Sequence, residues 1–273
     1  MQSLINIFQR TKEILCKYDY YIYTSKRVLH ISNSESKIPH LMGMQYIGEL
    51  NQFTGDYGVY LIKKGRITHE KIEKLVRKYY RREEKQRIIF EMIYRKLNNL
   101  HSLEEMFQSY SELYLYEKAE ETAFTCDYLM VHESEKVILH LGLVKSANNK
   151  GVFHCNSFMA TYQTDREKNL FFRDLSHRYE INKIIREDKF TKRIRTIYQS
   201  SDAETRERIG IAKMLAAEAI VADEKLIDKF ISINQKFGKY HLVHELRNVT
   251  TMLAKCENKQ EEMLVRSVSK ALL

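Results

Sequence analysis

Histidine is the residue type in this chain best suited to acid–base chemistry at neutral pH, and four histidines lie among predicted strands and turns: His40, His132, His140 and His154. An imidazole can accept or donate a proton near pH 7. Arginine, lysine and hydroxyl side chains can bind the oxygens of a phosphoryl group. Together these groups are what metal-free RNA cleavage needs: one base for the ribose 2′-OH, cations for the charged phosphate, and one acid for the leaving 5′-oxygen.

Other reaction types lack their sequence motifs. The chain has no Gly-rich phosphate loop, no G-x-S-x-G, no H-E-x-x-H and no carboxylates at metal-ligand spacing, so we expect neither a metal nor a cofactor. Its four cysteines, Cys16, Cys126, Cys155 and Cys256, form no C-x-x-C pair. We expect them to be reduced thiols of a cytoplasmic protein rather than zinc ligands.

His40 follows Pro39, which is the single proline of the chain, in the segment SKIPHLMGMQYIGEL (36–50). Proline disfavours the helical conformation in the residue before it, so we expect Ile38 to be extended and His40 to be held at a rigid strand-to-turn junction. Gly43 allows a sharp turn directly afterwards. A rigidly placed histidine is suited to proton transfer. The alternative is that Pro39 and His40 simply begin a helix, with His40 packing or capping.

Further candidates come from the predicted strands and a basic loop. His154 and Ser157 are three residues apart, so on an ideal strand they face opposite sides, and they can serve one site only if a bulge or a strand end intervenes. His140 lies in the apolar run VILHLGL, which is typical of a core histidine. Each other candidate can also be an ordinary core or surface residue. Our candidate catalytic residues are His40, Arg66, Ser157 and Tyr162, and our candidate RNA-binding residues are Lys63, Lys64, His154 and Arg178.

Periodic patterns predict the elements that position these residues. The run RKYYRREEKQR (77–87) interleaves tyrosines with arginines; it could stack on RNA, but a solvated helix junction is the favoured reading. Thr68 can cap one helix, and Ser102 with Glu105 resembles a capping box. Helices are expected at 2–17, 69–81 and 83–100 and from 102; strands are expected at 20–25, 26–32, 59–65, 126–134, 136–146 and 151–162 and near 178–187.

The elements and charges divide the chain into two predicted domains. Residues 1–195 form an α+β domain in which 126–190 is an antiparallel meander, and residues 200–273 form an all-α module. Of the net charge of +9, residues 1–199 carry +8 and residues 200–273 carry +1. A basic first domain suits a polyanion such as RNA. No apolar run has the length of a membrane span, and residues 1–15 lack the pattern of a secretory signal.

The segment PHLMG after two predicted strands resembles the signature of a family of phage-associated barnase–EndoU–colicin–RelE-like nucleases, the fourth such group. Asp127-Tyr128, Ser157-Phe158, Tyr162 and the run RDLSHRYEI follow in the order of that family, over about residues 18–190. The family signature contains the element HL-x-G, which is His40-Leu41-Met42-Gly43 here. Family members commonly continue this element with a lysine-containing stretch, whereas this chain continues with Met44-Gln45-Tyr46-Ile47. We therefore expect no lysine of this segment to assist His40.

The resemblance implies a small curved antiparallel sheet with flanking helices. It also implies a metal-independent endoribonuclease that acts as a toxin or defence effector of phage or mobile-element context. In that case His40 is the general acid or base, and Arg66, Ser157 and Tyr162 contact the phosphate. The alternative is a catalytically inactive relative that binds RNA or a host protein. In addition to RNA, we expect a protein partner or inhibitor that binds through the helical module at 200–273.

Overall fold

The computed structural model describes residues 2–48, 52–116, 125–147, 149, 151–168 and 177–201. The chain divides into two compact units, Met1–Ile181 and Asn182–Leu273. Of the second unit, only residues 182–201 are described. The predicted helical module therefore lies outside the described residues from position 202 onward, and the predicted domain boundary between 195 and 200 stays a prediction.

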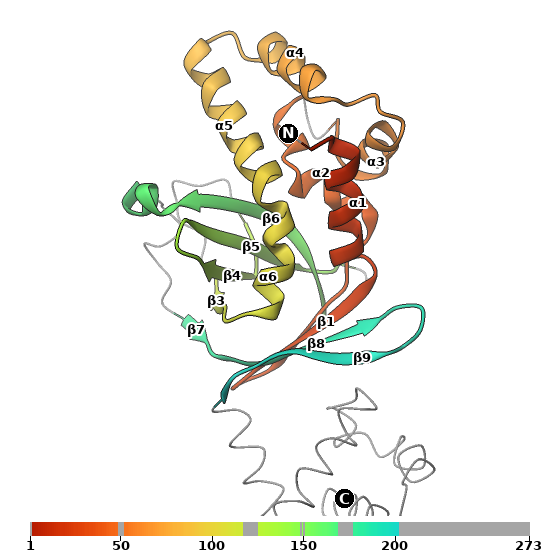
Figure 1. The fold of residues 1–273 in the computed structure, drawn as a ribbon, viewed down its shortest axis with the longest axis vertical. Coiled ribbons are helices and arrows are strands. Elements are labelled where there is room, and N and C mark those ends of the chain that lie inside the picture. Colours follow the sequence, from red (N-terminus) through yellow and green to blue (C-terminus); the bar gives the residue numbers. More distant parts are fainter. Residues whose placement is uncertain are drawn as a thin grey trace, which may run out of the picture. The chain divides into compact units, whose positions relative to one another are not determined.

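Seven strands of the first unit form a curled mixed sheet in the order β7-β3-β4-β5-β6-β2-β1 (Figure 1). They are β1 (Tyr18–Thr24), β2 (Val28–Ile31), β3 (Glu112–Leu115), β4 (Tyr128–Glu133), β5 (Val137–Lys145), β6 (Val152–Tyr162) and β7 (His177–Tyr179). The predicted strands at 20–25, 26–32, 126–134, 136–146 and 151–162 are confirmed. These segments are rich in the β-branched, aromatic and other apolar residues that strands favour, and β4 and β5 are buried on both faces.

The expectation of a purely antiparallel sheet is wrong at one pair, because β2 and β6 run parallel. The described pairs β1–β2, β3–β4, β4–β5, β5–β6 and β3–β7 are antiparallel. Parallel neighbours need a long connection, and the helices between residues 38 and 108 lie in the connection from β2 to the later strands. The chain near 178–187 is strand, as predicted, but it does not extend the meander from β6, since β7 pairs with β3.

In the second unit, β8 (Ile181–Asp188) and β9 (Ile194–Gln199) pair as an antiparallel hairpin. The carboxylate of Asp188 accepts hydrogen bonds from the N–H groups of Phe190 and Thr191, at 3.0 and 2.8 Å, which closes the turn. Such an Asx turn is a local arrangement that aspartate favours.

Helices supply the rest of the first unit. The α-helices are α1 (Leu4–Leu15), α2 (Ile38–Leu41), α3 (Gly55–Lys63), α4 (His69–Tyr79), α5 (Glu83–Asn99) and α6 (Leu103–Gln108), and the short 3₁₀ turns are η1 (Glu35–Lys37), η2 (Met44–Tyr46), η3 (Leu100–Ser102) and η4 (Gln163–Lys168). The predicted cap of α4 is confirmed, since the Thr68 hydroxyl accepts a hydrogen bond from the N–H of Lys71. The predicted capping box is wrong, because the Ser102 side chain makes no capping bond.

The strand expected at 59–65 is wrong as well, because this segment belongs to α3. Its residues alternate with the period of a helix: Val59 and Ile62 are buried, whereas Tyr57 and Tyr60 are exposed. The prediction of a strand followed the β-branched and aromatic composition of VYLIKKG and gave too little weight to the helical spacing of its apolar residues.

The helices pack on the sheet and bury one of its faces. In Figure 1, α5 and α6 cross the sheet, and α5 and α2 both contact β6. The ring of Tyr20 on β1 stacks on that of Phe107 on α6, with centroids 4.2 Å apart. On β6 the helix-facing side chains Phe153, Cys155, Phe158 and Ala160 are buried. These contacts fix α2 and α5 against the strand that carries His154 and Ser157.

Candidate active site

His40 lies in α2, a single helical turn that begins with Ile38 and Pro39. The expectation that Ile38 is extended and that His40 lies at a strand-to-turn junction is wrong, since the φ of −61° and ψ of −46° of Ile38 are helical. The alternative, that Pro39 and His40 begin a helix, is confirmed. Ile38 and Leu41 are fully buried, so their packing outweighs the weak preference that a following proline imposes. Proline itself is tolerated there because the N–H groups of a first helical turn have no intrahelical acceptor. His40 remains half-buried.

The turn after His40 has the conformation expected from its glycine. Gly43 has a φ of +87°, and its N–H donates a hydrogen bond to the His40 carbonyl, with 3.0 Å between nitrogen and oxygen. A Cβ atom at Gly43 would lie 3.3 Å from Cδ of Lys96 and 3.4 Å from Cγ1 of Ile93. Glycine therefore serves two purposes here, since it permits the left-handed turn and lets α5 approach closely.

Lys96 enters this cluster from α5 and was not among the predicted residues. Its side chain is only 2% exposed, and its Nζ has no hydrogen-bond partner among the described residues. The Nζ lies 5.2 Å from the centre of the Tyr46 ring, a distance typical of a cation–π contact. A lysine from α5 thus reaches the turn that follows His40.

One signal in the sequence could have identified Lys96. The buried residues of α5 include Ile89, Ile93 and Lys96, which follow one another at spacings of four and three. A lysine within such an apolar stripe is buried rather than solvated. Lysines are rarely buried without a partner, so this position is a candidate functional residue on physical grounds.

Burial and charge set the protonation of both groups. Burial lowers the pKa of Lys96 to about 7. The pKa of His40 is lowered to about 4, first by burial and then by the charges of Lys96 and Lys37. At neutral pH the His40 imidazole is therefore uncharged and able to accept a proton.

A β-bulge brings His154 and Ser157 to the same face of β6. In the register with β5, His154 pairs with Val144 and Ser157 pairs with Gly142, and the register shifts between Gly142 and Leu143. Asn156 is the extra residue on β6. Because the partners Val144 and Gly142 are two apart and lie on one face of β5, the side chains of His154 and Ser157 point to one side of the sheet. The condition under which these two residues could serve one site is thus met.

The segment with His40 meets β6 where β2 ends. The buried Asn33, just after β2, accepts a hydrogen bond from the N–H of Cys155 at 2.7 Å, so the side chain replaces a strand partner there. Lys37 then acts on both histidines: its charge lowers the pKa of His154, after the larger effect of burial, as it does that of His40. Ser157 is buried, on the face of β6 opposite the helix-facing Cys155 and Phe158.

The other predicted residues lie elsewhere on the first unit. Tyr162 pairs with Val137 and faces the opposite side of β6 from Ser157, with its ring 4.7 Å from the guanidinium of Arg95. Arg66 is exposed after α3, with its guanidinium 5.4 Å from the Tyr60 ring.

The predicted RNA-binding cations differ in how they are paired. Lys63 forms an ion pair with Glu35, while Lys64 is exposed. On β7, the guanidinium of Arg178 lies 3.0 Å from a carboxylate oxygen of Glu112. The charges of Lys37 and Lys96 therefore act on His40, and His154 shares a sheet face with Ser157, whereas Arg66, Tyr162 and Arg178 have separate surroundings.

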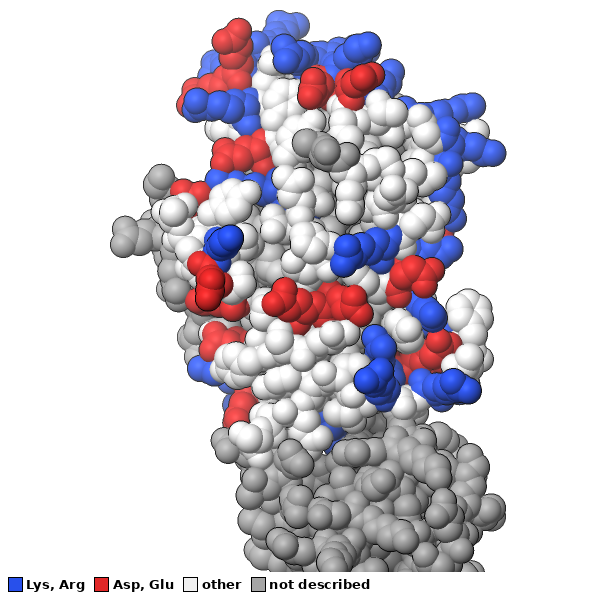
Figure 2. All heavy atoms as spheres, viewed as in Figure 1, with Lys and Arg blue, Asp and Glu red and all other residues white. Residues whose placement is uncertain are grey.

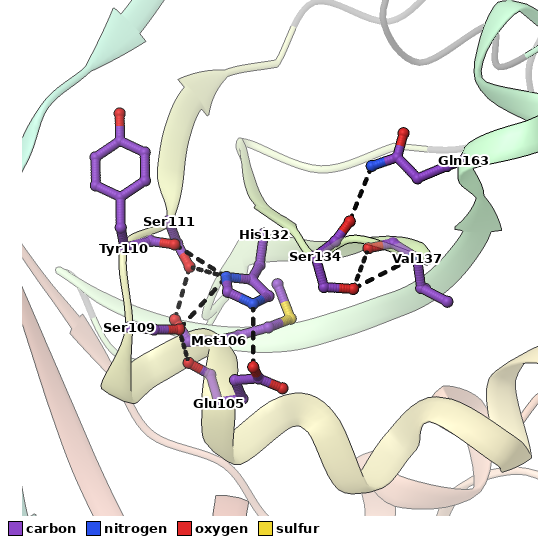
Figure 3. A network of polar contacts seen from close by, with 9 residues as sticks. All are labelled: Glu105, Met106, Ser109, Tyr110, Ser111, His132, Ser134, Val137 and Gln163. Carbon is purple, nitrogen blue, oxygen red and sulfur yellow. Dashed lines mark hydrogen bonds and ion pairs between the residues drawn. The ribbon is translucent and has the colours of Figure 1, made fainter.

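Two further histidines have structural surroundings. His132 is buried and its Nδ1 lies 2.9 Å from the carbonyl oxygen of Tyr110, while its Nε2 lies 3.8 Å from a Glu105 carboxylate oxygen (Figure 3). It thereby joins α6 to β4. His140 is fully buried and burial lowers its pKa to about 3, which confirms the expected core position.

No group of three or more His, Cys, Asp or Glu side chains is placed to hold a metal ion within the part of the chain that the structure describes. Across the same residues, none of the helices combines the length and apolar character that crossing a membrane requires.

Comparison with known proteins assigns a family to this arrangement. The sequence model of the family described as phage-Barnase-EndoU-ColicinE5/D-RelE like nuclease4 matches residues 3–203. This range contains α2, α5 and β6. No curated protein and no solved structure was found to match the chain.

Proposed function

Because the chain belongs to the phage-Barnase-EndoU-ColicinE5/D-RelE like nuclease4 family, we propose that it is a metal-independent endoribonuclease whose general base is His40. The observation that carries this proposal is a half-buried histidine near a buried lysine whose Nζ has no hydrogen-bond partner in the part of the chain that the structure describes. Burial first, and then the charges of Lys96 and Lys37, lower the pKa of His40, so its imidazole is uncharged at neutral pH. Strongly shifted pKa values that arise from burial and a specific charge are typical of active sites.

In the proposed reaction, His40 takes the proton of a ribose 2′-OH, and the 2′-oxygen attacks the adjacent phosphorus. The bond from phosphorus to the 5′-oxygen breaks, which leaves a 2′,3′-cyclic phosphate and a 5′-OH. Ser157 and Lys37 are our candidates for contacts to the phosphoryl oxygens. The leaving 5′-oxygen takes its proton from water, since the lowered pKa of His154 leaves its imidazole uncharged at neutral pH. His154 shares a sheet face with Ser157 and is our candidate for a contact to the RNA.

Lys96 is a positioning residue in this scheme. Its side chain is buried and therefore cannot contact bound RNA, so it acts only through His40. Its charge favours the neutral form of His40. The phage association of the family supports a role as a toxin or defence effector. The sequence also predicts Arg66 and Tyr162 as phosphate contacts. We keep these two roles as proposals, but the reaction described above does not use them.

The test incubates the full chain with total RNA in buffer that contains EDTA and compares it with His40→Ala. His101→Ala is a matched control, since His101 is exposed on η3. We expect cleavage by the wild-type and control chains, cyclic phosphate ends, and a rate reduced by about 10²–10⁴ in His40→Ala. Loss of cleavage on chelation that Mg²⁺ restores would overturn the mechanism. Equal rates for wild type and His40→Ala would overturn the assignment, and intact RNA throughout would favour the inactive RNA- or protein-binding alternative.

A further inference from the structure

Two tyrosines on α3 expose much of their surface although the helix buries its other side. Tyr57 is 55% exposed and Tyr60 is 41% exposed. Their rings are nearly parallel, with an interplanar angle of 19° and centroids 6.3 Å apart. The Arg66 guanidinium continues this row at 5.4 Å from the Tyr60 ring centre. These three side chains present flat, exposed groups that contribute little to the core.

α3 is fixed against the helix that carries His40. A Cβ at Gly58 would lie 2.2 Å from the carbonyl oxygen of Phe53 and 3.0 Å from Cβ of Pro39. Only glycine allows this approach, because any side chain would collide with the Phe53 backbone. Tyr57 and Tyr60 lie on either side of Gly58 in the sequence. They therefore project from a helix, α3, that packs directly against Pro39 of α2.

The charge around this surface is strongly positive. Residues 63–87 contain 11 Lys and Arg and four Asp and Glu residues, so they carry +7 of the net +9 of the chain. Figure 2 shows Lys and Arg side chains gathered over α4, at the top of α5 and beside α3. Lys64 and Arg66 are exposed next to the tyrosine pair. A polyanion matches this charge.

From these observations we infer that Tyr57, Tyr60 and Arg66 form a stacking platform for the bases of single-stranded RNA. The inference rests on the proposed nuclease function and specifies its substrate. Aromatic rings and arginine planes stack on unpaired bases of any sequence, while the bases of a duplex are already stacked on one another. The platform therefore selects single strands without reading their sequence.

The experiment measures binding of the full wild-type chain by fluorescence anisotropy. The probes are a 2′-O-methyl RNA oligonucleotide, which cannot be cleaved through its 2′-oxygen, the same strand in a duplex, and an abasic strand of equal charge. The test variant is Tyr57→Leu/Tyr60→Leu, which keeps apolar bulk and removes the rings. Phe190→Leu is the matched control, because Phe190 is an exposed aromatic residue in the β8–β9 turn.

We expect the double variant to bind the single strand about ten- to a hundredfold more weakly, as the loss of one or two stacked bases implies. Its affinity for the abasic strand and the duplex should stay unchanged, as should all affinities of Phe190→Leu. Unchanged affinity for the single strand would overturn the platform, and so would an equal loss for all three probes. Ring-dependent binding by a chain that does not cleave RNA would refute the proposed function and leave the platform standing.

Discussion

Replacing Lys96 with methionine removes an ammonium group from the interior and keeps a side chain of similar length. Burial lowers the pKa of Lys96 from 10.5 to about 7. A shift of about 3.5 units corresponds to about 5 kcal/mol of lost unfolding free energy, at about 1.36 kcal/mol per unit. The Tyr46 ring lies 5.2 Å from Nζ, within cation–π distance. We therefore expect Lys96→Met to raise the free energy of unfolding by up to about 5 kcal/mol at pH 6.

The gain depends on pH with a definite sign. Between pH 7 and 10.5 the unfolded chain holds a proton on Lys96 that the folded chain has released, so the stability of the wild-type chain rises with pH in this window. Below pH 7 both states are protonated and the full cost of burying the charge remains. Methionine has no proton to lose. The gain in unfolding free energy of Lys96→Met over the wild-type chain is therefore greatest below pH 7. The part of this gain that comes from the charge of Lys96 falls to zero as the pH approaches 10.5.

Urea denaturation at pH 6 and pH 9.5, followed by circular dichroism, measures both effects. Lys71→Met on α4 is the matched control, because Lys71 is exposed and its loss should change stability little at either pH. If Lys96→Met is no more stable than the wild-type chain at pH 6 while the control is unchanged, the buried ammonium has a satisfied environment. The lowered pKa of Lys96 would then be refuted.

Three further predictions concern His40, Gly58 and His132. The value of kcat/KM should rise with pH, with a midpoint near the His40 pKa of about 4. In Lys96→Met this midpoint should move to higher pH, because one of the charges that oppose protonation of His40 is gone. An unmoved midpoint would contradict the effect of Lys96 on His40. Gly58→Ala should lower the free energy of unfolding by about 2 kcal/mol or more in urea titrations, since its methyl group would lie 2.2 Å from the Phe53 carbonyl oxygen. His132→Ala should cost about 1–3 kcal/mol of stability, because it leaves buried polar groups unpaired, and should keep the turnover rate per folded molecule; a slower folded enzyme would place His132 in the site.

Local sequence patterns predicted most of the elements correctly. The periods of two and of 3.6 residues located five strands of the sheet and the helices α1, α4 and α5, because side-chain burial along an element depends mainly on its own apolar spacing. The same reasoning failed at α3, where composition favoured a strand, and at Ile38, where burial outweighed the effect of Pro39. Both failures are cases in which packing with other elements overrode a local preference.

The sequence by itself determined which groups are available for chemistry and which family the chain resembles: a histidine after the single proline, a glycine three residues later, and an excess of cations over carboxylates. Only the tertiary structure decided which of these groups meet. The bulge at Asn156 aligns His154 with Ser157, and α5 brings Lys96 beside the turn at Gly43. Lys96 and Gly43 lie 53 positions apart in the sequence, and the bulge exists only through the pairing of β6 with β5. Their geometry and the pKa shifts that follow from burial depend on how helices and sheet pack, which no local pattern contains.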